Sequence, residues 1–174
     1  RNKSITDCFE PGSVMKAISI AIALKANKEL YKKGAHPIFS PEEMIRCDQT
    51  MFPGRSRPLT DVRTHKYLNM YMAVQKSSNV YPAKLTQKVI EALGATWYRK
   101  QLEEVFGLGV KSGVELPYEN AGLIPTPGKL HPNGTCEWSA PTPYSLAMGY
   151  NLMVNAVQMT RAMAVVANGG YLVR

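Results

Sequence analysis

The sequence predicts an α+β fold that is mostly helical over its 174 residues. Apolar residues recur at the helical spacing i, i+3, i+4 and i+7 in several segments, whereas only short stretches near residues 44–46 and 171–173 favour strands. Hydrophobic residues make up 45% of the chain, which suffices for a packed core. Because the chain starts at Arg1 and ends directly after a helix-stop signal, we expect residues 1–174 to be an excised part of one larger domain.

The net charge of +8 permits attraction to nucleic acid or to an anionic membrane or cell-wall polymer. Lysines and arginines are spread along the chain, however, and no nucleic-acid-binding motif accompanies them. We therefore expect a generally basic surface and no nucleic-acid partner. The sequence also contains no visible signal peptide and no apolar run long enough to span a membrane.

Cysteines and histidines do not have the spacing of a metal site. Three cysteines are too few and too far apart for a disulfide framework, and an odd number leaves at least one unpaired: Cys8, Cys47 and Cys136. The histidines stand alone, without the cysteine or carboxylate spacing of a zinc site: His36, His65 and His131. We therefore expect no metal and no cofactor.

The first candidate site lies where the first long helix should begin. Pro11 and Gly12 interrupt the backbone before the apolar run 14–24, so Ser13 should start a helix with Lys16 one turn further on. Positions i and i+3 share a helix face, so the hydroxyl and the amine can meet as nucleophile and base at the positive end of the helix dipole. The helix is apolar nearly all round, which should bury Lys16 and lower its pKa. Taken alone, the short pattern also fits a capping serine and a lysine that extends into solvent.

The second candidate site follows a predicted second helix. The first helix should be followed by a connector at 28–41, a short strand or irregular segment at 42–50 and a loop at 51–58. Thr60 or Asp61 should then cap a second helix, whose apolar stripe faces the core and consists of Tyr67, Met70, Tyr71 and Val74. This helix should deliver Ser77, Ser78 and Asn79 into the break before the next helix. A hydroxyl there can relay a proton and an amide can hydrogen-bond a substrate carbonyl or the lysine, although Ser-Ser-Asn is also a common capping sequence.

The remaining segments are predicted to serve packing. A helix should end at Gly94, with an apolar stripe of Leu85, Val89, Ile90 and Leu93. A shorter helix should span 97–106, and glycine and proline predict extended loops over 107–143. A final helix, with the stripe Ala156, Met159, Met163 and Val166, should be closed by Asn168-Gly169-Gly170, after which residues 171–173 should begin a strand.

Two loop segments imitate catalytic motifs. Lys111-Ser112-Gly113 has the composition of a Lys-Ser/Thr-Gly triplet but should lie in a loop, not on a strand after the glycine turn. Glu115 and Glu119 lack the spacing of the glutamate that activates the deacylating water in β-lactamases, and exposed loop carboxylates are usually solvated. We assign neither segment to the site.

Together, the motifs resemble those of class B penicillin-binding proteins. The set consists of Ser-x-x-Lys at 13–16 and Ser-x-Asn at 77–79, which penicillin-binding proteins and β-lactamases combine with a third motif, Lys-Thr-Gly. The likeness extends to Phe9–Lys16, Gln75–Val80, Phe106–Gly109 running into Gly113–Pro117, and Ala164–Gly170. It covers almost the whole chain in the right order. The resemblance implies the helical part of the transpeptidase fold, with most of its antiparallel sheet and the third motif outside these residues.

The resemblance also implies a reaction, in which the D-Ala-D-Ala amide of a peptidoglycan stem peptide acylates Ser13 and a second stem peptide resolves the acyl-enzyme. Lys16 would be the base, Ser77 the proton relay, and Asn79 and Ser78 substrate-binding residues, while the Ser13 N–H would form half of an oxyanion hole. β-Lactams would trap Ser13. Implied partners are a glycosyltransferase and division or elongation proteins, and the implied location is the extracytoplasmic face of the cytoplasmic membrane, anchored by a helix outside this segment.

Two alternatives stay open at the level of sequence. A β-lactamase or penicillin sensor of the same superfamily is disfavoured because no Glu-x-x-Leu-Asn loop is present. A non-catalytic module is the other, since without the third motif the isolated segment should be weakly acylated or not acylated at all.

Overall fold

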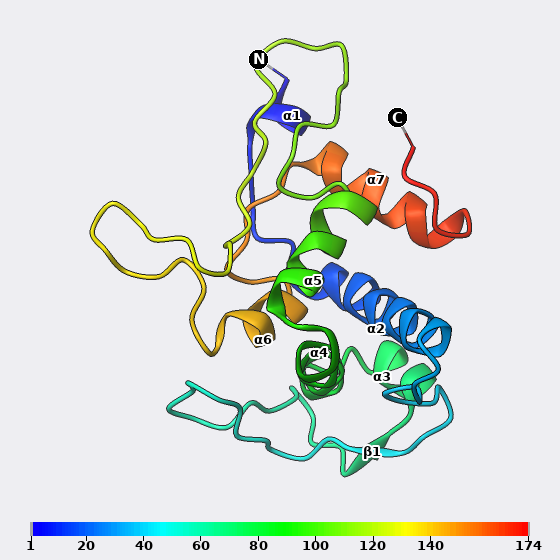
Figure 1. The fold of residues 1–174 in the computed structure, drawn as a ribbon. Helices are drawn as coiled ribbons and strands as arrows, with labels where there is room; N and C mark the ends of the chain where they lie inside the picture. The colour runs from blue at the N-terminus through cyan, green and yellow to red at the C-terminus, as the bar shows by residue number, and fades with distance from the viewer. Residues whose placement is uncertain (1, 174) are drawn as a thin grey trace.

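The computed structural model describes residues 2–173, which form a helical body with long loops at its periphery (Figure 1). Its elements are, in order, α1 (Lys3–Thr6), η1 (Gly12–Val14), α2 (Met15–Lys32), β1 (Ile45–Arg46), β2 (Tyr67–Leu68), α3 (Met70–Gln75), α4 (Val80–Leu93), α5 (Ala95–Lys100), η2 (Gln101–Val105), α6 (Thr142–Ala147) and α7 (Ala156–Ala167). Strands β1 and β2 pair antiparallel, with Ile45 opposite Leu68. The predicted mostly helical α+β class is confirmed.

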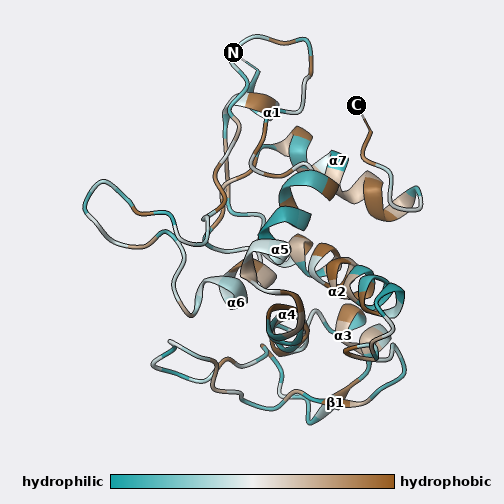
Figure 2. Cartoon of the chain, viewed as in Figure 1, coloured by the Kyte–Doolittle hydropathy of each residue, from teal (hydrophilic) through white to brown (hydrophobic). Residues whose placement is uncertain are grey.

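Helix α2 is the centre of this arrangement and contacts α3, α4, α6 and α7. Its inward face packs on α4, and the two helices contribute fully buried side chains, among them Met15, Ile18, Ile22, Val80, Tyr81, Leu85 and Val89. Each apolar side chain of this size removed from water contributes about 1.5–3 kcal/mol. Figure 2 shows hydrophobic and hydrophilic residues alternating along α4, mostly hydrophobic residues in the first turns of α2, and hydrophilic residues in its last turns. The core therefore holds the start of α2, where Lys16 lies, while Ser13 lies just before it in η1 and is exposed.

A buried polar cluster joins helix α7 to the long loop before α6. Asn155 and Gln158 form a reciprocal capping box at the start of α7, and both side chains are fully buried. Gln158 Nε2 donates to the carbonyl oxygens of Val110 (2.6 Å) and Ala121 (2.8 Å), and Asn155 Nδ2 donates to that of Asn120 (2.9 Å). Because buried carbonyls need partners, these bonds determine where the loop crosses the helix.

Several sequence predictions are confirmed. The first long helix, the strand near residue 45, the break at 75–79 and the helix ending at Gly94 are all present. The final helix ends at Ala167 and is followed by Gly169 and Gly170 with positive φ, as a left-handed cap requires. The first helix continues five residues into the predicted connector, to Lys32.

Other boundary predictions are wrong. No helix starts at Thr60 or Asp61: Tyr67 and Leu68 form β2, and α3 begins at Met70, where Asn69 Oδ1 accepts the Met72 N–H (3.0 Å). Helix α6, with its proline in the first turn, begins inside the predicted loop 107–143 and continues to Ala147, where no element was predicted. Residues 171–173 form no strand, because no part of the chain between residues 2 and 173 pairs with them.

The apolar stripe 67–74, predicted to be core, is instead mostly solvent-exposed. Tyr67 is 45% exposed, and Tyr71 and Val74 are each 56% exposed. Tyr71 and Val74 line an apolar groove between α2, α3 and α7. Leu24 of α2 and Val166 of α7 also line this groove. Across residues 2–173, no helix combines the length and apolarity that crossing a lipid bilayer requires.

Replacing Gln158 with Leu should lower the free energy of unfolding by about 1–3 kcal/mol, because the Val110 and Ala121 carbonyls and the Asn155 N–H would lose their buried partner. Denaturant unfolding of the protein measures this change. Gln87→Leu is the matched control, since among residues 2–173 the Gln87 side chain bonds only to Glu91, in an exposed pair on α4. Equal effects of the two substitutions would contradict the assigned role.

Candidate active site

Ser13 lies in the short helical turn η1 that leads directly into α2, and its side chain is exposed. Gly12 adopts φ +58°, a conformation that glycine takes without strain, and thereby turns the chain into the helix. Within residues 2–173, the Ser13 N–H donates no hydrogen bond, and none joins the Ser13 hydroxyl to Lys16. Both groups therefore remain available to a bound molecule.

The turn that carries Ser13 rests on the backbone at residues 149–151. The Gly12 N–H donates to the Gly149 carbonyl (3.0 Å), and the Glu10 carboxylate accepts the Asn151 N–H (2.7 Å). The contact is so close that a Cβ on Gly149 would lie 2.0 Å from the Gly12 oxygen. Only glycine allows this approach, so residue 149 helps to set the position of the serine turn.

Lys16 is buried, with 7% of its surface exposed, and points toward the turn between α3 and α4. Its Nζ donates to the Ser77 carbonyl oxygen (2.6 Å) and to Ser77 Oγ (3.1 Å). Burial lowers the pKa of Lys16 below its ordinary value, and the negative charge of Asp61 partly offsets this effect. The predicted desolvation of Lys16 is thus present. Its partner in the second polar group is Ser77, whereas the Asn79 amide, expected as a partner for a substrate carbonyl or for the lysine, donates to the Thr60 carbonyl.

Ser77 holds an unusual backbone conformation for a residue that is not glycine. Its φ of +51° lies in the left-handed region, which costs an ordinary residue about 1–2 kcal/mol. The N–H groups of Ser77 and Ser78 cap the end of α3 by donating to Val74 (3.1 Å) and Ala73 (3.0 Å). This turn directs the Ser77 oxygens at Lys16.

Ser78 and Asn79 differ from Ser77 in their contacts. Ser78 is buried, and its hydroxyl donates to Asp61 Oδ2 (2.7 Å) and accepts the Tyr81 N–H (3.0 Å). The Asn79 side chain is half-buried and donates Nδ2 to the Thr60 carbonyl (3.1 Å), which leaves its amide oxygen without a donor among residues 2–173. The predicted substrate contact suits the Asn79 oxygen, whereas the Ser78 hydroxyl is already committed inside the protein.

Two residues of this region were not predicted as part of the site. Gly149 has no local signal, because its role depends on the approach of Gly12 from a distant segment. Asp61 was recognised as a capping residue but assigned to the helix that follows it in sequence. Its Oδ1 instead accepts the N–H groups of Asn79 (2.5 Å) and Val80 (3.0 Å) at the start of α4.

The decoy segment Lys111-Ser112-Gly113 lies in a loop, as predicted. The Glu119 carboxylate accepts the Ser112 N–H (2.7 Å), and although burial acts in the opposite direction, hydrogen bonds from Ser112 and Gly113 hold the pKa of Glu119 below its ordinary value. Glu119 therefore supports the loop. Within the described part of the chain, no group of three His, Cys, Asp or Glu side chains is placed to hold a metal ion.

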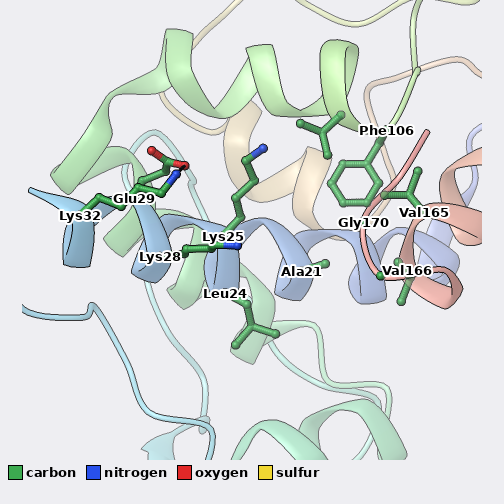
Figure 3. Close-up of a pocket in the computed structure, with 12 residues that line it drawn as sticks. Ala21, Leu24, Lys25, Lys28, Glu29, Lys32, Phe106, Val165, Val166 and Gly170 are labelled. Carbon is green, nitrogen blue, oxygen red and sulfur yellow. Dashed lines mark hydrogen bonds and ion pairs between the residues drawn. The ribbon is translucent and has the colours of Figure 1, made fainter.

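A separate open cavity of about 530 Å³ runs along α2 toward α7 (Figure 3). Lys28, Lys32 and Glu29 lie at one end of it, and Phe106, Val165 and Val166 at the other. Neither Ser13, Lys16 nor Ser77 lines this cavity. The candidate chemistry is therefore at the start of α2, where Lys16 meets Ser77, and not in this cavity.

Comparison with known proteins points in the same direction. Residues 1–174 match the family described as the penicillin binding protein transpeptidase domain. The chain is 31% identical over 173 residues to the probable peptidoglycan D,D-transpeptidase PbpC of Pseudomonas aeruginosa, covering 99% of this chain and 26% of that protein. It is 31% identical over 170 residues to the peptidoglycan D,D-transpeptidase FtsI of Buchnera aphidicola, covering 98% of this chain and 26% of that protein.

A solved structure agrees with the fold. Penicillin binding protein 3 of Mycobacterium tuberculosis, complexed with aztreonam, superposes with a TM-score of 0.76 at 30% identity, over 97% of this chain and 33% of that one. The chain thus spans about a quarter of the length of the curated relatives and a third of this structure.

Replacing Gly149 with Ala should destabilise the protein, because the added Cβ would overlap the Gly12 backbone. The loss should exceed, by about 1–3 kcal/mol, that of a Gly→Ala change at a glycine of similar φ whose Cβ would meet no neighbour. Gly134→Ala is that reference: its φ is +81°, against +85° at Gly149, and its Cβ would meet nothing within 4 Å. Thermal unfolding of the two variants measures the difference. Equal losses would mean that the turn relaxes freely.

Proposed function

The chain belongs to the family of penicillin-binding protein transpeptidase domains, and on this premise we propose that the protein carrying it is a peptidoglycan D,D-transpeptidase that cross-links stem peptides through an acyl-enzyme on Ser13. The observation that carries the proposal is the position of the Lys16 amine. It is buried, lies one helical turn after Ser13, and donates hydrogen bonds to Ser77 in the turn between α3 and α4. A buried amine of lowered pKa beside a serine is the arrangement that nucleophilic catalysis needs.

In the first step, Ser13 Oγ attacks the carbonyl carbon of the D-Ala-D-Ala amide while neutral Lys16 accepts the hydroxyl proton. A neutral amine has two N–H groups and one lone pair. Because the two N–H groups donate to the Ser77 carbonyl and hydroxyl oxygens, the lone pair is left for the Ser13 proton. This assignment requires an unprotonated amine, which burial of Lys16 favours.

In the second step, the tetrahedral intermediate collapses and expels the terminal D-Ala, whose amine receives the proton from Lys16 through the Ser77 hydroxyl. The Ser13 N–H, which has no acceptor among residues 2–173, supplies one donor to the oxyanion. Removing one such donor costs about 3 kcal/mol in enzymes where this was tested. The amide oxygen of Asn79, which has no donor among residues 2–173, accepts from the substrate amide. An amine of a second stem peptide then attacks the acyl carbon, and the ester bond to Ser13 Oγ breaks as the new amide bond forms. Ser13 Oγ takes up the proton that the amine loses, so the cross-link is released and the serine is regenerated.

The surrounding residues have supporting roles. We assign Ser78 to holding the turn, because its hydroxyl is buried and bonded within the protein. The relatives are nearly four times as long as the matched region, so we expect the rest of the pocket, including a Lys-Thr/Ser-Gly motif, from other parts of the protein. We further propose an extracytoplasmic location on a membrane anchor, and glycosyltransferase and division or elongation proteins as partners.

β-Lactams should acylate Ser13, because their strained amide replaces the D-Ala-D-Ala bond in the first step. Incubating the full-length protein with a fluorescent penicillin should give one labelled band and one adduct by intact-mass analysis, mapped to Ser13. Ser13→Ala should abolish the adduct. Ser4→Ala, a change at another exposed serine near the N-terminus, is the control and should label normally. A folded full-length protein that forms no adduct would refute the proposed function.

The rate of acylation should rise with pH through the pKa of Lys16, because only the neutral amine accepts the serine proton. Burial lowers that pKa, so the acid limb of the pH profile should lie below the titration range of exposed lysines. Lys16→Arg keeps the charge but cannot act as base near neutral pH and should slow acylation by about 10²–10⁴-fold. Lys28→Arg, an exposed change on the same helix, should leave the rate unchanged. Stopped-flow labelling across pH measures both effects, and an unchanged rate in Lys16→Arg would exclude Lys16 as the base.

A further inference from the structure

The carboxylate of Asp61 accepts hydrogen bonds from the three residues that follow Ser77 in the sequence. Asp61 lies in the segment between β1 and β2. The loop that precedes it in this segment has no recognisable motif. Oδ2 accepts the Ser78 hydroxyl (2.7 Å), and Oδ1 accepts the N–H groups of Asn79 (2.5 Å) and Val80 (3.0 Å). Asp61 therefore restrains three consecutive residues at the start of α4.

Ser77 is held between two anchors as a result. On its N-terminal side, the Ser77 and Ser78 N–H groups are bonded to the end of α3, and on its C-terminal side the Asp61 carboxylate holds residues 78–80. A left-handed serine relaxes to an ordinary conformation unless its surroundings prevent it. Loss of the second anchor would free the peptide that presents both Ser77 oxygens to Lys16.

We propose that Asp61 is a positioning residue for acylation: through Ser78 and the start of α4, its carboxylate holds Ser77 in the geometry that binds the Lys16 amine. This proposal deepens the proposed function and rests on it for its effect on rate. Asp61 touches neither the substrate nor the reacting atoms, and acts through Ser77 and Lys16.

The same carboxylate also acts on Lys16 through its charge. Burial is the larger influence and lowers the pKa of Lys16, while Asp61 raises it. Titratable groups near Asp61 include Cys47 and Asp48, which line the same small cavity, and Lys84 of α4, whose charge acts on both of them. Removing the Asp61 charge while keeping its shape should therefore lower the pKa of Lys16 further.

Asp61→Asn in the full-length protein is the direct test, with fluorescent penicillin as the probe. We expect the second-order rate constant for labelling to fall by about 10–100-fold, since small displacements of catalytic groups have effects of this size. The acid limb of the remaining activity should move to lower pH, a shift that a purely structural cap would not produce. Asp48→Asn is the matched control, because Asp48 lines the same cavity but its carboxylate pairs with Arg46 in its own segment and with no other residue in the described range 2–173. The pH profile of this variant should stay that of the wild type.

Ser78→Ala tests the route of the effect. If Asp61 acts through Ser78, the variant that combines Asp61→Asn with Ser78→Ala should lose less of the labelling rate than the product of the two single fold-losses. Asp61→Glu, which keeps the charge, is the second variant should Asp61→Asn fail to fold, and it should lower the rate without moving the acid limb to lower pH. A folded Asp61→Asn protein that labels at the wild-type rate, or whose acid limb stays in place, would overturn the proposal.

An NMR titration of isotope-labelled Lys16 separates this proposal from the proposed function, because it does not require acylation. A lower pKa of Lys16 in Asp61→Asn than in the wild type is expected even if the wild-type protein forms no penicillin adduct. An unchanged pKa of Lys16 would refute the coupling of Asp61 to Lys16, whatever the labelling experiment shows.

Discussion

The two hydrogen bonds from Lys16 to Ser77 are the interaction on which the geometry of this site depends. An amine buried in an apolar helix is costly unless its N–H groups find acceptors, and Ser77 supplies both a carbonyl and a hydroxyl oxygen. The bonds connect residues 61 positions apart, so they determine where the turn after α3 sits relative to α2. Burial also keeps the amine easy to deprotonate. One contact thus serves both structure and chemistry.

Three further arrangements fix the path of the chain in the same molecule. Gly149 lets the Ser13 turn pack against residues 149–151, and Asp61 caps α4 immediately after Ser77. Further away, Gln158 and Asn155 join α7 to the loop at 107–141. Each arrangement relies on polar groups or a glycine, not on apolar packing. This is typical of positions where the path of the chain must be exact to a fraction of an ångström, because hydrogen bonds are directional and hydrophobic contacts are not.

The exposed apolar groove between α2, α3 and α7 shows that the helical spacing of apolar residues does not by itself predict that they are buried. Tyr71 and Val74 recur at helical spacing and were predicted to be core, and they do share one face of α3. They are nevertheless about half exposed, because no other part of residues 2–173 covers that face. Helical spacing determines which side chains lie together, whereas a second element is needed to bury them.

The sequence by itself determined the features that depend on near neighbours. Proline and glycine before an apolar run placed Ser13 at a helix start with Lys16 one turn later, and the break at 75–79 and the glycine cap after residue 167 followed from local signals. Only the tertiary structure decided the partners of residues far apart in the chain. Asp61 was recognised as a cap, yet its helix begins 19 residues later, and residues 171–173 lacked the neighbour that a strand requires. Local conformation is encoded in adjacent residues, but a long-range hydrogen bond depends on the path of every loop between its two ends.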